Sequence, residues 1–151
     1  MRMPVEGTIA RGDLHDDKPE YYTGKSANGT LVTKNPLALT SLVMERGQQR
    51  YNIYCQPCHG AMGDGKGIVA IRGQTLGFVP PTNFQTADMM KKPDGHYFDV
   101  ISHGIRNMQA YQYQVKVDDR WAIVHYVRAL QRSQHASMKD VPDSIQTKVI
   151  K

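Results

Sequence analysis

The sequence predicts an all-α protein with short helices and long connecting loops. Apolar residues recur at helical spacing in three segments, and glycine and proline gather between those segments. No stretch alternates apolar and polar residues for long enough to indicate a strand, and no repeat of about 20 to 50 residues is visible. With 151 residues, 40% of them apolar and 22% charged, the chain is expected to form one domain around a single core.

The first segment of the chain reads as an extended arm. From Met1 to about Leu39, glycines and prolines interrupt every helical or strand pattern. Two interpretations remain open at this point: a disordered tail, which is common at chain termini, and a strap that lies along another protein. The strap is favoured by apolar and aromatic anchors spaced along the arm, namely Val5, Ile9, Leu14, Tyr21 and Tyr22.

The first clear helix is expected to begin at Thr40 or Ser41, either of which can cap it, and to run to the first cysteine. Gly47 stands inside this helix. A glycine costs a helix roughly 1 kcal/mol relative to alanine, so it usually marks the close approach of another element. We therefore expect a second element to come very near the first helix at Gly47.

The later elements follow in order. Residues 60–87 are rich in glycine and proline and are predicted to form a long loop without regular structure. After residues 93–95, HYFDVISHGI predicts a short amphipathic helix that ends at Gly104. The strongest helix signal opens with Asp118 and Asp119, where acidic residues suit the helix dipole. Its apolar stripe includes Trp121, Val124 and Leu130.

These elements divide the chain into an arm (1–40), a helical domain (41–133) and a C-terminal tail (134–151). The longest apolar runs fall well short of the roughly 20 residues needed to cross a bilayer. No charged stretch followed by an apolar one begins the chain. We therefore expect neither a direct membrane span nor a signal sequence within these residues.

Charge is distributed unevenly. Residues 1–40 hold five basic and five acidic side chains, so residues 41–151 carry the whole net charge of +5. No run of five Lys or Arg residues and no interleaved stacking aromatics occur, so nucleic acid is not an expected partner. The basic side chains in the loops either steer an acidic partner or are scattered solubilising charge; they are Lys66, Arg72, Lys91, Lys92 and Arg106.

The only two cysteines, Cys55 and Cys58, stand in CQPCH, with His59 directly after them. C-x-x-C-H is the attachment sequence for haem c, in which both thiols form thioethers with the porphyrin and the histidine becomes an axial iron ligand. The cysteines are one helical turn apart and so face the same side. His59 can then turn its imidazole under the ring that they hold.

Three other interpretations of the cysteine pair are less favoured. A structural zinc site needs about four Cys or His ligands, usually in two pairs, and no second cysteine pair exists. A thioredoxin-like dithiol shares the C-x-x-C spacing but belongs to a βαβ pattern, which this chain lacks. A disulfide across two residues would close a very short loop and stabilise little. One covalently bound haem c is therefore the expected cofactor.

The second axial position decides between electron carrier and enzyme, because an open position admits chemistry at the iron. Met108, in GIRNMQAY, follows His59 by 49 residues and lies in the loop before the last helix, where the chain can return over the far face of the haem. His103 and His125 are rivals, and an open site is the third possibility. We favour Met108 as the ligand of the metal opposite His59.

Residues 41–133 resemble a class I cytochrome c. The resemblance rests on Gly47 and Tyr51 before CxxCH, a methionine in GIRNMQAY, and W-x-x-x-x-Y-V-x-x-L in the last helix. It implies short helices around one covalently bound haem, with the first and last helices crossing at Gly47. An aromatic residue of the last helix, Tyr126, is then expected to pack on that glycine, with Ile123 and Tyr51 beside it.

The same resemblance implies that the ligand histidine donates a hydrogen bond to a proline carbonyl in the loop after the haem motif, which would fix the orientation of the imidazole. The position maps to Pro81, with Pro80 as the alternative. In this family such a protein is not an enzyme by itself. It exchanges one electron at a time.

A closer resemblance extends beyond the domain. MPVEGTIARG, RGQQRYNIYCQPCH and DRWAIVHYVRALQRSQ together look like the monohaem cytochrome c subunit of bacterial alternative complex III, a quinol-oxidising respiratory membrane complex. The resemblance implies partners that include a multihaem cytochrome c, and a downstream electron acceptor such as a terminal oxidase. It also implies a place on the periplasmic side of the inner membrane, as a peripheral or lipid-anchored subunit. The lipidated N-terminal cysteine common in that family is not present in this chain.

Two alternatives to this function remain. The protein could be a free soluble periplasmic shuttle, which would have no need of the arm. Less in keeping with the sequence, it could be a haem enzyme of the peroxidase type, with Met108 as a displaceable ligand.

Overall fold

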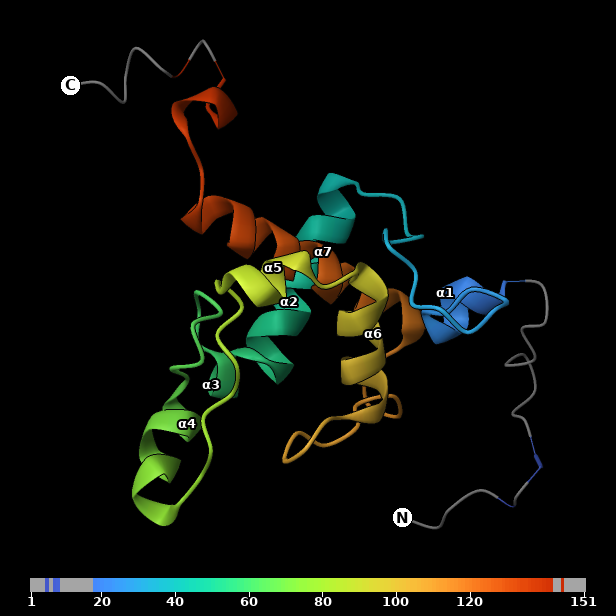
Figure 1. Ribbon diagram of the computed structural model, residues 1–151, viewed down its shortest axis with the longest axis horizontal. Coiled ribbons are helices and arrows are strands. Elements are labelled where there is room, and N and C mark those ends of the chain that lie inside the picture. The colour runs from blue at the N-terminus through green and yellow to red at the C-terminus, as the bar shows by residue number, and fades with distance from the viewer. Residues whose placement is uncertain (1–4, 6, 9–17, 143–144, 146–151) are drawn as a thin grey trace.

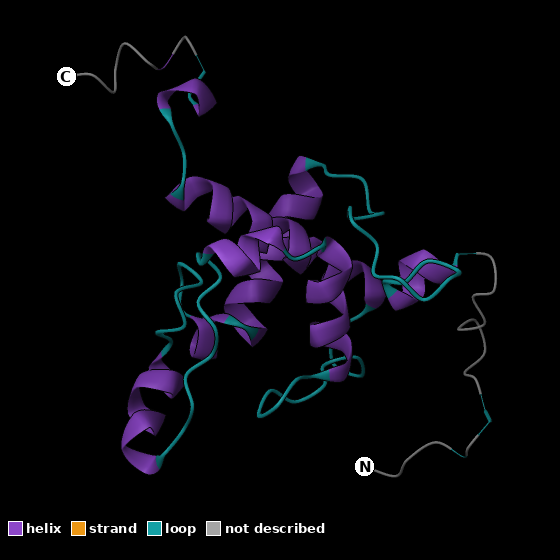
Figure 2. Ribbon diagram, in the orientation of Figure 1, coloured by secondary structure: helices purple, strands orange, loops and turns teal. Residues whose placement is uncertain are grey.

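The computed structural model describes residues 5, 7–8, 18–142 and 145, and these residues form short helices joined by loops (Figure 1). Figure 2 shows no strand in the described part, which holds only two isolated β-bridges. The all-α prediction is confirmed. The elements are α1 (Pro19–Thr23), α2 (Ser41–Tyr54), α3 (Gln56–His59), α4 (Ile68–Gly73), the 3-10 helix η1 (Gln74–Leu76), α5 (Ala87–Lys91), α6 (Asp94–His103), α7 (Val117–Gln134) and the 3-10 helix η2 (Met138–Asp140).

The crossing of α2 and α7 forms the centre of the molecule (Figure 1). A Cβ atom at Gly47 would lie 2.1 Å from the backbone oxygen of Ala122, so only glycine allows the two helices to come this close. Beside this contact, Arg46 donates to the Asp119 carboxylate at 2.6 Å, and Arg50 lies 3.3 Å from it. The close approach expected at Gly47 is thus made by the backbone of α7.

Helix α6 packs against α7 through aromatic and charged contacts. The Phe98 ring stacks on the Trp121 ring with centroids 4.1 Å apart, and both side chains are fully buried. Arg128 of α7 donates to the Asp94 carboxylate at the start of α6, at 2.6 Å. Stacked aromatic rings of this size bury much apolar surface and hold two helices at a fixed angle. The stacked rings and the ion pair together hold α6 against α7.

Part of the predicted arm is built into this domain. The Trp121 indole donates to the carbonyl of Tyr21 at 2.6 Å, and the Asn35 amide donates to the carbonyl of Trp121 at 2.8 Å. The His125 ring lies 2.8 Å from the carbonyl of Leu37. The segment from α1 to residue 40 therefore lies along α6 and α7 of its own chain. The sequence did not lead us to expect this packing.

The remaining part of the arm cannot be placed in the same way. Two of its predicted anchors, Ile9 and Leu14, lie outside the described residues, and Val5 is exposed. The strap therefore stays a prediction for residues before 18. The division of the chain at residues 40 and 133 also stays a prediction.

Three helix predictions are confirmed. The Thr40 hydroxyl accepts a hydrogen bond from the Val43 amide at 3.2 Å and so caps α2. Helix α6 ends before Gly104, as expected, and α7 begins at Val117, one residue before the predicted start. No helix among the described residues is long and apolar enough to cross a bilayer.

The prediction that residues 60–87 lack regular structure is wrong in part. Helix α4 and the 3-10 helix η1 occupy residues 68–76 within that stretch. The glycines that suggested a loop stand at the ends of these elements: Gly67 precedes α4, and Gly77 follows η1 with a positive φ of 78°. They delimit the helical turns rather than interrupt them. Ala70, within α4, is fully buried.

Candidate haem site

The haem-attachment motif sits where α2 gives way to α3. Cys55 follows the last residue of α2, and Cys58 and His59 end α3. The buried hydroxyl of Tyr51, one turn before Cys55, donates to the carbonyl of Gly60 at 2.7 Å. This bond joins the last turn of α2 to the residue directly after His59. The motif is therefore held at both ends by the helix that crosses α7.

His59 and Met108 line one cavity of the molecule together with Cys55. The cavity contains about 430 Å³ of space not filled by atoms, part of it open to solvent. It lies among α2, α6 and α7, and its wall is almost wholly apolar or aromatic. The other lining residues are Tyr51, Phe84, Met89, His96, Tyr97, Val100, Ile101, Ile123 and Val127.

A tight turn carries Met108 to the cavity. Ile105 and Met108 form an isolated antiparallel bridge, with N to O distances of 3.0 and 2.9 Å. Arg106 within the turn has a φ of 52°, a left-handed conformation that few residues adopt. A Cβ atom at Gly104 would lie 2.3 Å from the carbonyl oxygen of Met108, so the turn folds back onto the end of α6. This geometry fixes the backbone from which the methionine side chain extends.

The two rival histidines lie elsewhere. The His103 ring is exposed and lies 3.0 Å from the Asp99 carboxylate, one turn back on α6. The His125 ring is engaged with the carbonyl of Leu37. Neither residue lines the cavity that contains His59. Of the three residues weighed from the sequence, Met108 is the one that shares the cavity with His59.

Two lining residues with side chains that can bind iron, His96 of α6 and Met89 of α5, were not predicted as site residues. His96 stands four residues before Val100, which also lines the cavity, so the helical period of α6 was a signal that could have found it. Burial, and next the nearby charge of Lys92, lowers the pKa of His96. Met89 is held in place at its backbone, because its carbonyl accepts a hydrogen bond from the Tyr97 hydroxyl at 2.6 Å.

Burial lowers the pKa of His59 to about 4, so its imidazole is neutral near pH 7. A neutral imidazole is the form that binds a metal. The ring stacks on Phe84, with centroids 4.6 Å apart and planes inclined by 21°. Its buried Nδ1 atom has no hydrogen-bond partner among the described residues.

The hydrogen bond expected between His59 and the carbonyl of Pro81 is therefore absent from the structure, and Pro80 does not supply it either. The Pro81 carbonyl packs instead over Gly65, where a Cβ atom would lie 2.4 Å from the oxygen. The contact that holds the imidazole plane here is the stacking on Phe84. We had inferred no role for Phe84 from the sequence.

No disulfide joins the two cysteines. Burial, and then the neighbouring Cys58, raises the pKa of Cys55 to about 12, so its thiol stays protonated at neutral pH. The donor set fits haem c: two thiols and a neutral imidazole on one segment, a thioether sulfur on another, and an apolar space between the helices. Such a wall excludes water from a bound porphyrin.

The helix crossing predicted beside the cavity places its four residues together. A Cβ atom at Gly47 would lie 3.2 Å from the Cβ atom of Tyr126, although the backbone of α7 is nearer. The Tyr126 and Tyr51 rings lie 5.3 Å apart between centroids. Ile123 lines the cavity. The crossing thus connects the close helix contact directly to the site.

Comparisons with known proteins agree with this arrangement. Among solved structures, a reducing HAO-like protein complex of Kuenenia stuttgartiensis matches with a TM-score of 0.52 and 24% identity, over 74% of this chain and 54% of that one. This chain therefore spans about half the length of that relative, and the likeness concerns the fold alone. The c-type cytochrome KustC0563 matches with a TM-score of 0.47 and 24% identity, over 56% of this chain and 96% of that one. No curated protein matches the chain.

A family model settles the assignment. The model described as cytochrome c oxidase, cbb3-type, subunit III matches residues 43–127, which is more than half of the chain and includes both cysteines. The cytochrome c domain and the C-x-x-C spacing of Cys55 and Cys58 assign one covalently bound haem c to the protein. Its role as a cytochrome c is electron transfer. The chain belongs to the cytochrome c family represented by subunit III of cbb3-type cytochrome c oxidase.

Proposed function

We propose that the protein is a one-electron carrier, not an enzyme by itself, in which His59 and Met108 are the axial ligands of the haem iron. The observation that carries this proposal is the single apolar cavity that both residues line. A bound haem c supplies an iron that alternates between the ferric and ferrous states. If His59 and Met108 held the iron from its two sides, no position would be left for a substrate. This favours a carrier over a peroxidase-like enzyme.

The residues of the chain hold and insulate the cofactor. Cys55 and Cys58 attach the porphyrin, and His59 remains neutral because burial lowers its pKa to about 4. A methionine sulfur favours the ferrous iron and raises the reduction potential relative to a second histidine. The apolar wall from α6 and α7 excludes water, which limits the reorganisation that accompanies each change of charge.

We further propose that the protein is the monohaem cytochrome c subunit of alternative complex III, a quinol-oxidising respiratory membrane complex. It would receive electrons within that complex, where a multihaem cytochrome c is among its partners, and pass them to a downstream acceptor such as a terminal oxidase. Its place would be the periplasmic face of the bacterial inner membrane. The support is the resemblance of three separate segments, two in the domain and one in residues 3–12.

The ligand assignment is tested by the visible spectrum of the haem-loaded protein, oxidised and then reduced. A weak long-wavelength band of the ferric protein reports methionine sulfur on iron. We expect Met108→Ala to abolish this band and Met89→Ala, the matched control in the same cavity, to keep it. A band that survives in Met108→Ala would refute the assignment. Ready binding of carbon monoxide by the wild-type ferrous protein would favour the enzyme.

The assignment to a complex is tested by removing residues 1–17 only. A longer deletion would also remove Tyr21 and Asn35, which bond to Trp121 of the domain, and would confuse folding with assembly. We expect the shortened protein to keep its spectrum and to lose its association with the quinol-oxidising complex in detergent-solubilised membranes. If it still co-purifies, the strap hypothesis fails. If the intact chain never co-purifies, it is a free shuttle.

A further inference from the structure

One surface of the protein is much more apolar than a soluble domain requires. Six of the fourteen exposed large hydrophobic residues in the described part lie between residues 62 and 79, in and around α4 and η1, with exposed fractions of 44% to 88%. They are Met62, Ile68, Val69, Ile71, Leu76 and Val79. Exposed apolar residues gathered in one segment are a feature of interaction sites. We call these six residues the α4 patch.

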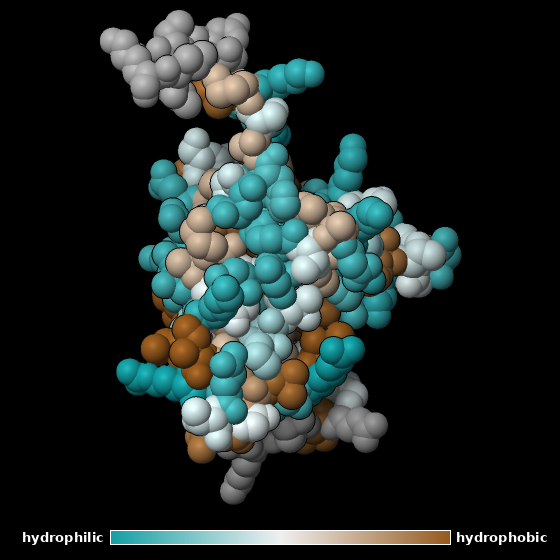
Figure 3. Space-filling model, turned by 60° about the vertical axis from the view of Figure 1, so that its left-hand side comes forward, coloured by the Kyte–Doolittle hydropathy of each residue, from teal (hydrophilic) through white to brown (hydrophobic). Residues whose placement is uncertain are grey.

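The α4 patch stands away from the α2–α7 crossing. Figure 1 shows α4 and the turn after it at the lower left, and Figure 3, which brings that side forward, shows strongly apolar residues gathered on the lower half of the face. The cavity assigned to the haem is lined by α2, α5, α6, α7 and the residues around them, and by no member of the patch. The patch therefore lies outside that cavity.

The base of the patch is bonded directly to the haem-attachment motif. The amide of Gly67 donates to the carbonyl of Cys58 at 3.1 Å, and the amide of Gly65 donates to the carbonyl of His59 at 2.8 Å. A Cβ atom at Gly67 would lie 2.3 Å from the carbonyl oxygen of Pro57. The segment is thus anchored on the peptide groups of the residues that hold the cofactor. A molecule bound at the patch lies beside the attachment of the haem.

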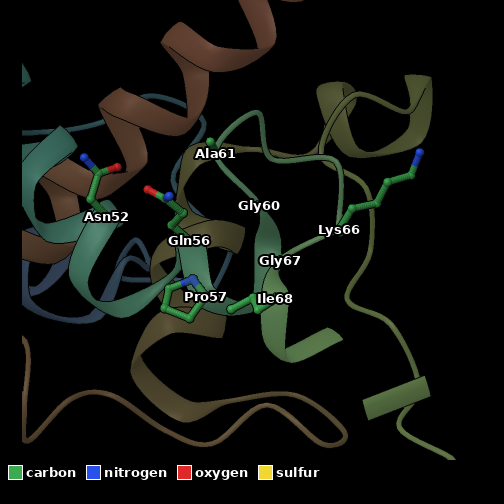
Figure 4. Close-up of a pocket in the computed structure, with 8 residues that line it drawn as sticks. All are labelled: Asn52, Gln56, Pro57, Gly60, Ala61, Lys66, Gly67 and Ile68. Carbon is green, nitrogen blue, oxygen red and sulfur yellow. The ribbon is translucent and has the colours of Figure 1, made fainter. Parts of the chain in front are cut away.

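An open groove lies beside the contact between α3 and α4, with about 500 Å³ of empty space that includes open solvent. Gln56 and Pro57 line it on the motif side and Ile68 on the other (Figure 4). Figure 4 also shows the Lys66 side chain extending away from the other labelled residues, toward solvent. The groove gives a protruding side chain of a partner a place next to the motif, with a cation at its edge.

The charge around α4 is mainly positive, although Asp64 stands between Met62 and Lys66. Residues 65–87 contain Lys66 and Arg72 and no Asp or Glu. Neither cation pairs with a carboxylate among the described residues; the Asp64 side chain accepts from the backbone amide of Lys66. An apolar centre with cations at its rim is complementary to an apolar surface with an acidic rim. The rim charge directs the approach of such a partner, and the apolar centre holds it.

We propose that the α4 patch is the docking surface for a redox protein that presents an apolar face rimmed by Asp and Glu. The proposal rests on the proposed function as an electron carrier and names the surface through which the carrier meets its partner. A lipid surface fits less well, because α4 has six residues and only two cations accompany it, whereas helices that lie in a membrane surface are long and rich in Lys and Arg.

The test uses the full haem-loaded protein and membranes of the producing organism from which this chain has been deleted. Two rates are measured from the haem absorbance: reduction of the protein by membranes supplied with quinol, and oxidation of the reduced protein by the same membranes in air. The variants are the double substitution Ile71→Asp with Leu76→Asp, and Arg72→Glu. Leu42→Asp, an exposed leucine at the start of α2, is the matched control.

We expect the double variant to exchange electrons at least ~10-fold more slowly in one or both directions, because it places charge at the apolar centre. Arg72→Glu should be slower by about 3-fold at low salt, and its difference from wild type should vanish at high salt. Leu42→Asp should stay within about 2-fold of wild type. Unchanged spectra and unchanged unfolding midpoints verify that the variants keep the fold.

Three results would overturn the proposal. A double variant that exchanges electrons at the wild-type rate in both directions removes the docking surface and leaves the carrier function intact. Wild-type protein that exchanges with these membranes in neither direction refutes the carrier function and the docking surface together. Flotation of the wild-type protein, but not of the double variant, with vesicles of phosphatidylglycerol and phosphatidylethanolamine assigns the patch to a lipid surface.

Discussion

The α2–α7 crossing and the α4 patch use glycine for opposite purposes. At the crossing, Gly47 removes a side chain so that two helices meet through their backbones, and Tyr51 beside it is wholly buried. At the patch, Gly67 and Gly77 bound short helical turns that leave Leu76 88% exposed. The crossing stabilises the fold and fixes the position of the site. The patch instead exposes apolar side chains, which lowers solubility. Substitutions should therefore act on folding in one region and on association in the other.

The largest expected effect is that of Gly47→Ala. The new Cβ atom would meet the backbone oxygen of Ala122 at 2.1 Å, and a backbone atom inside a helix cannot move aside alone. We expect the free energy of unfolding to fall by at least ~3 kcal/mol, or the protein not to accumulate. Denaturant unfolding of the haem-loaded protein measures it. Gln48→Ala, exposed on the same helix, is the control, and an equal loss in both would contradict the account of the crossing.

Tyr51→Phe tests the hydrogen bond that joins the α2–α7 crossing to the haem-attachment motif. It keeps the buried ring but removes the hydroxyl that donates to the carbonyl of Gly60 at 2.7 Å. Leaving that buried carbonyl without its donor should lower the free energy of unfolding by about 1–3 kcal/mol. Tyr113→Phe, on an exposed tyrosine, should change it little. A stability equal to wild type in Tyr51→Phe would mean that the bond does not hold the end of the motif.

Asn35→Ala tests the segment that the sequence had placed in the arm. The Asn35 side chain donates to the carbonyl of Trp121 at 2.8 Å and accepts from the amide of Leu37 at 3.0 Å. We expect a loss of about 1–2 kcal/mol of unfolding free energy. Asn107→Ala, on an exposed asparagine, provides the comparison. No loss would mean that residues 18–40 are not part of the cooperative domain.

The smallest effect on folding is expected at the patch. Leu76→Ser removes a side chain that is 88% exposed, so almost no packing is lost. The free energy of unfolding should stay within about 0.5 kcal/mol of wild type. A rise in solubility is expected in concentration series followed by light scattering, because exposed apolar surface promotes association. A marked loss of stability would show that the patch belongs to the core.

Much of the fold and of the haem site could be predicted because the signals are local. The haem-attachment motif CQPCH is only five residues long, and Thr40 caps the first turn of α2, which directly follows Thr40. A glycine inside a helix has few explanations other than the close approach of another element. The packing of residues 18–40 leaves no such pattern, because Trp121 and His125 bind carbonyl groups, which every residue possesses. A contact to a backbone carbonyl places no requirement on the type of residue that provides the carbonyl, so the sequence does not reveal it.

The errors have physical causes as well. We took the glycines of residues 60–87 as breaks, although they stand at the ends of short helical turns. The hydrogen bond from His59 to the Pro81 carbonyl stays a prediction; in this structure the His59 ring stacks on Phe84 and its Nδ1 atom has no partner among the described residues. His96 was overlooked because we did not follow the helical period of α6 from Val100 back to His96, which places both residues on the face that lines the cavity.

The turn that presents Met108 has a consequence for the order in which the protein comes apart. It is closed by two backbone bonds between Ile105 and Met108 and contains Arg106 in a left-handed conformation, with exposed residues throughout its middle. Few buried contacts secure it, so its local opening costs less free energy than separation of the helices. On gentle heating, the sulfur–iron band should fade while the helical circular dichroism remains. Under the proposed ligation by Met108, the protein would then release its sixth ligand as a separate, reversible event before the helices unfold.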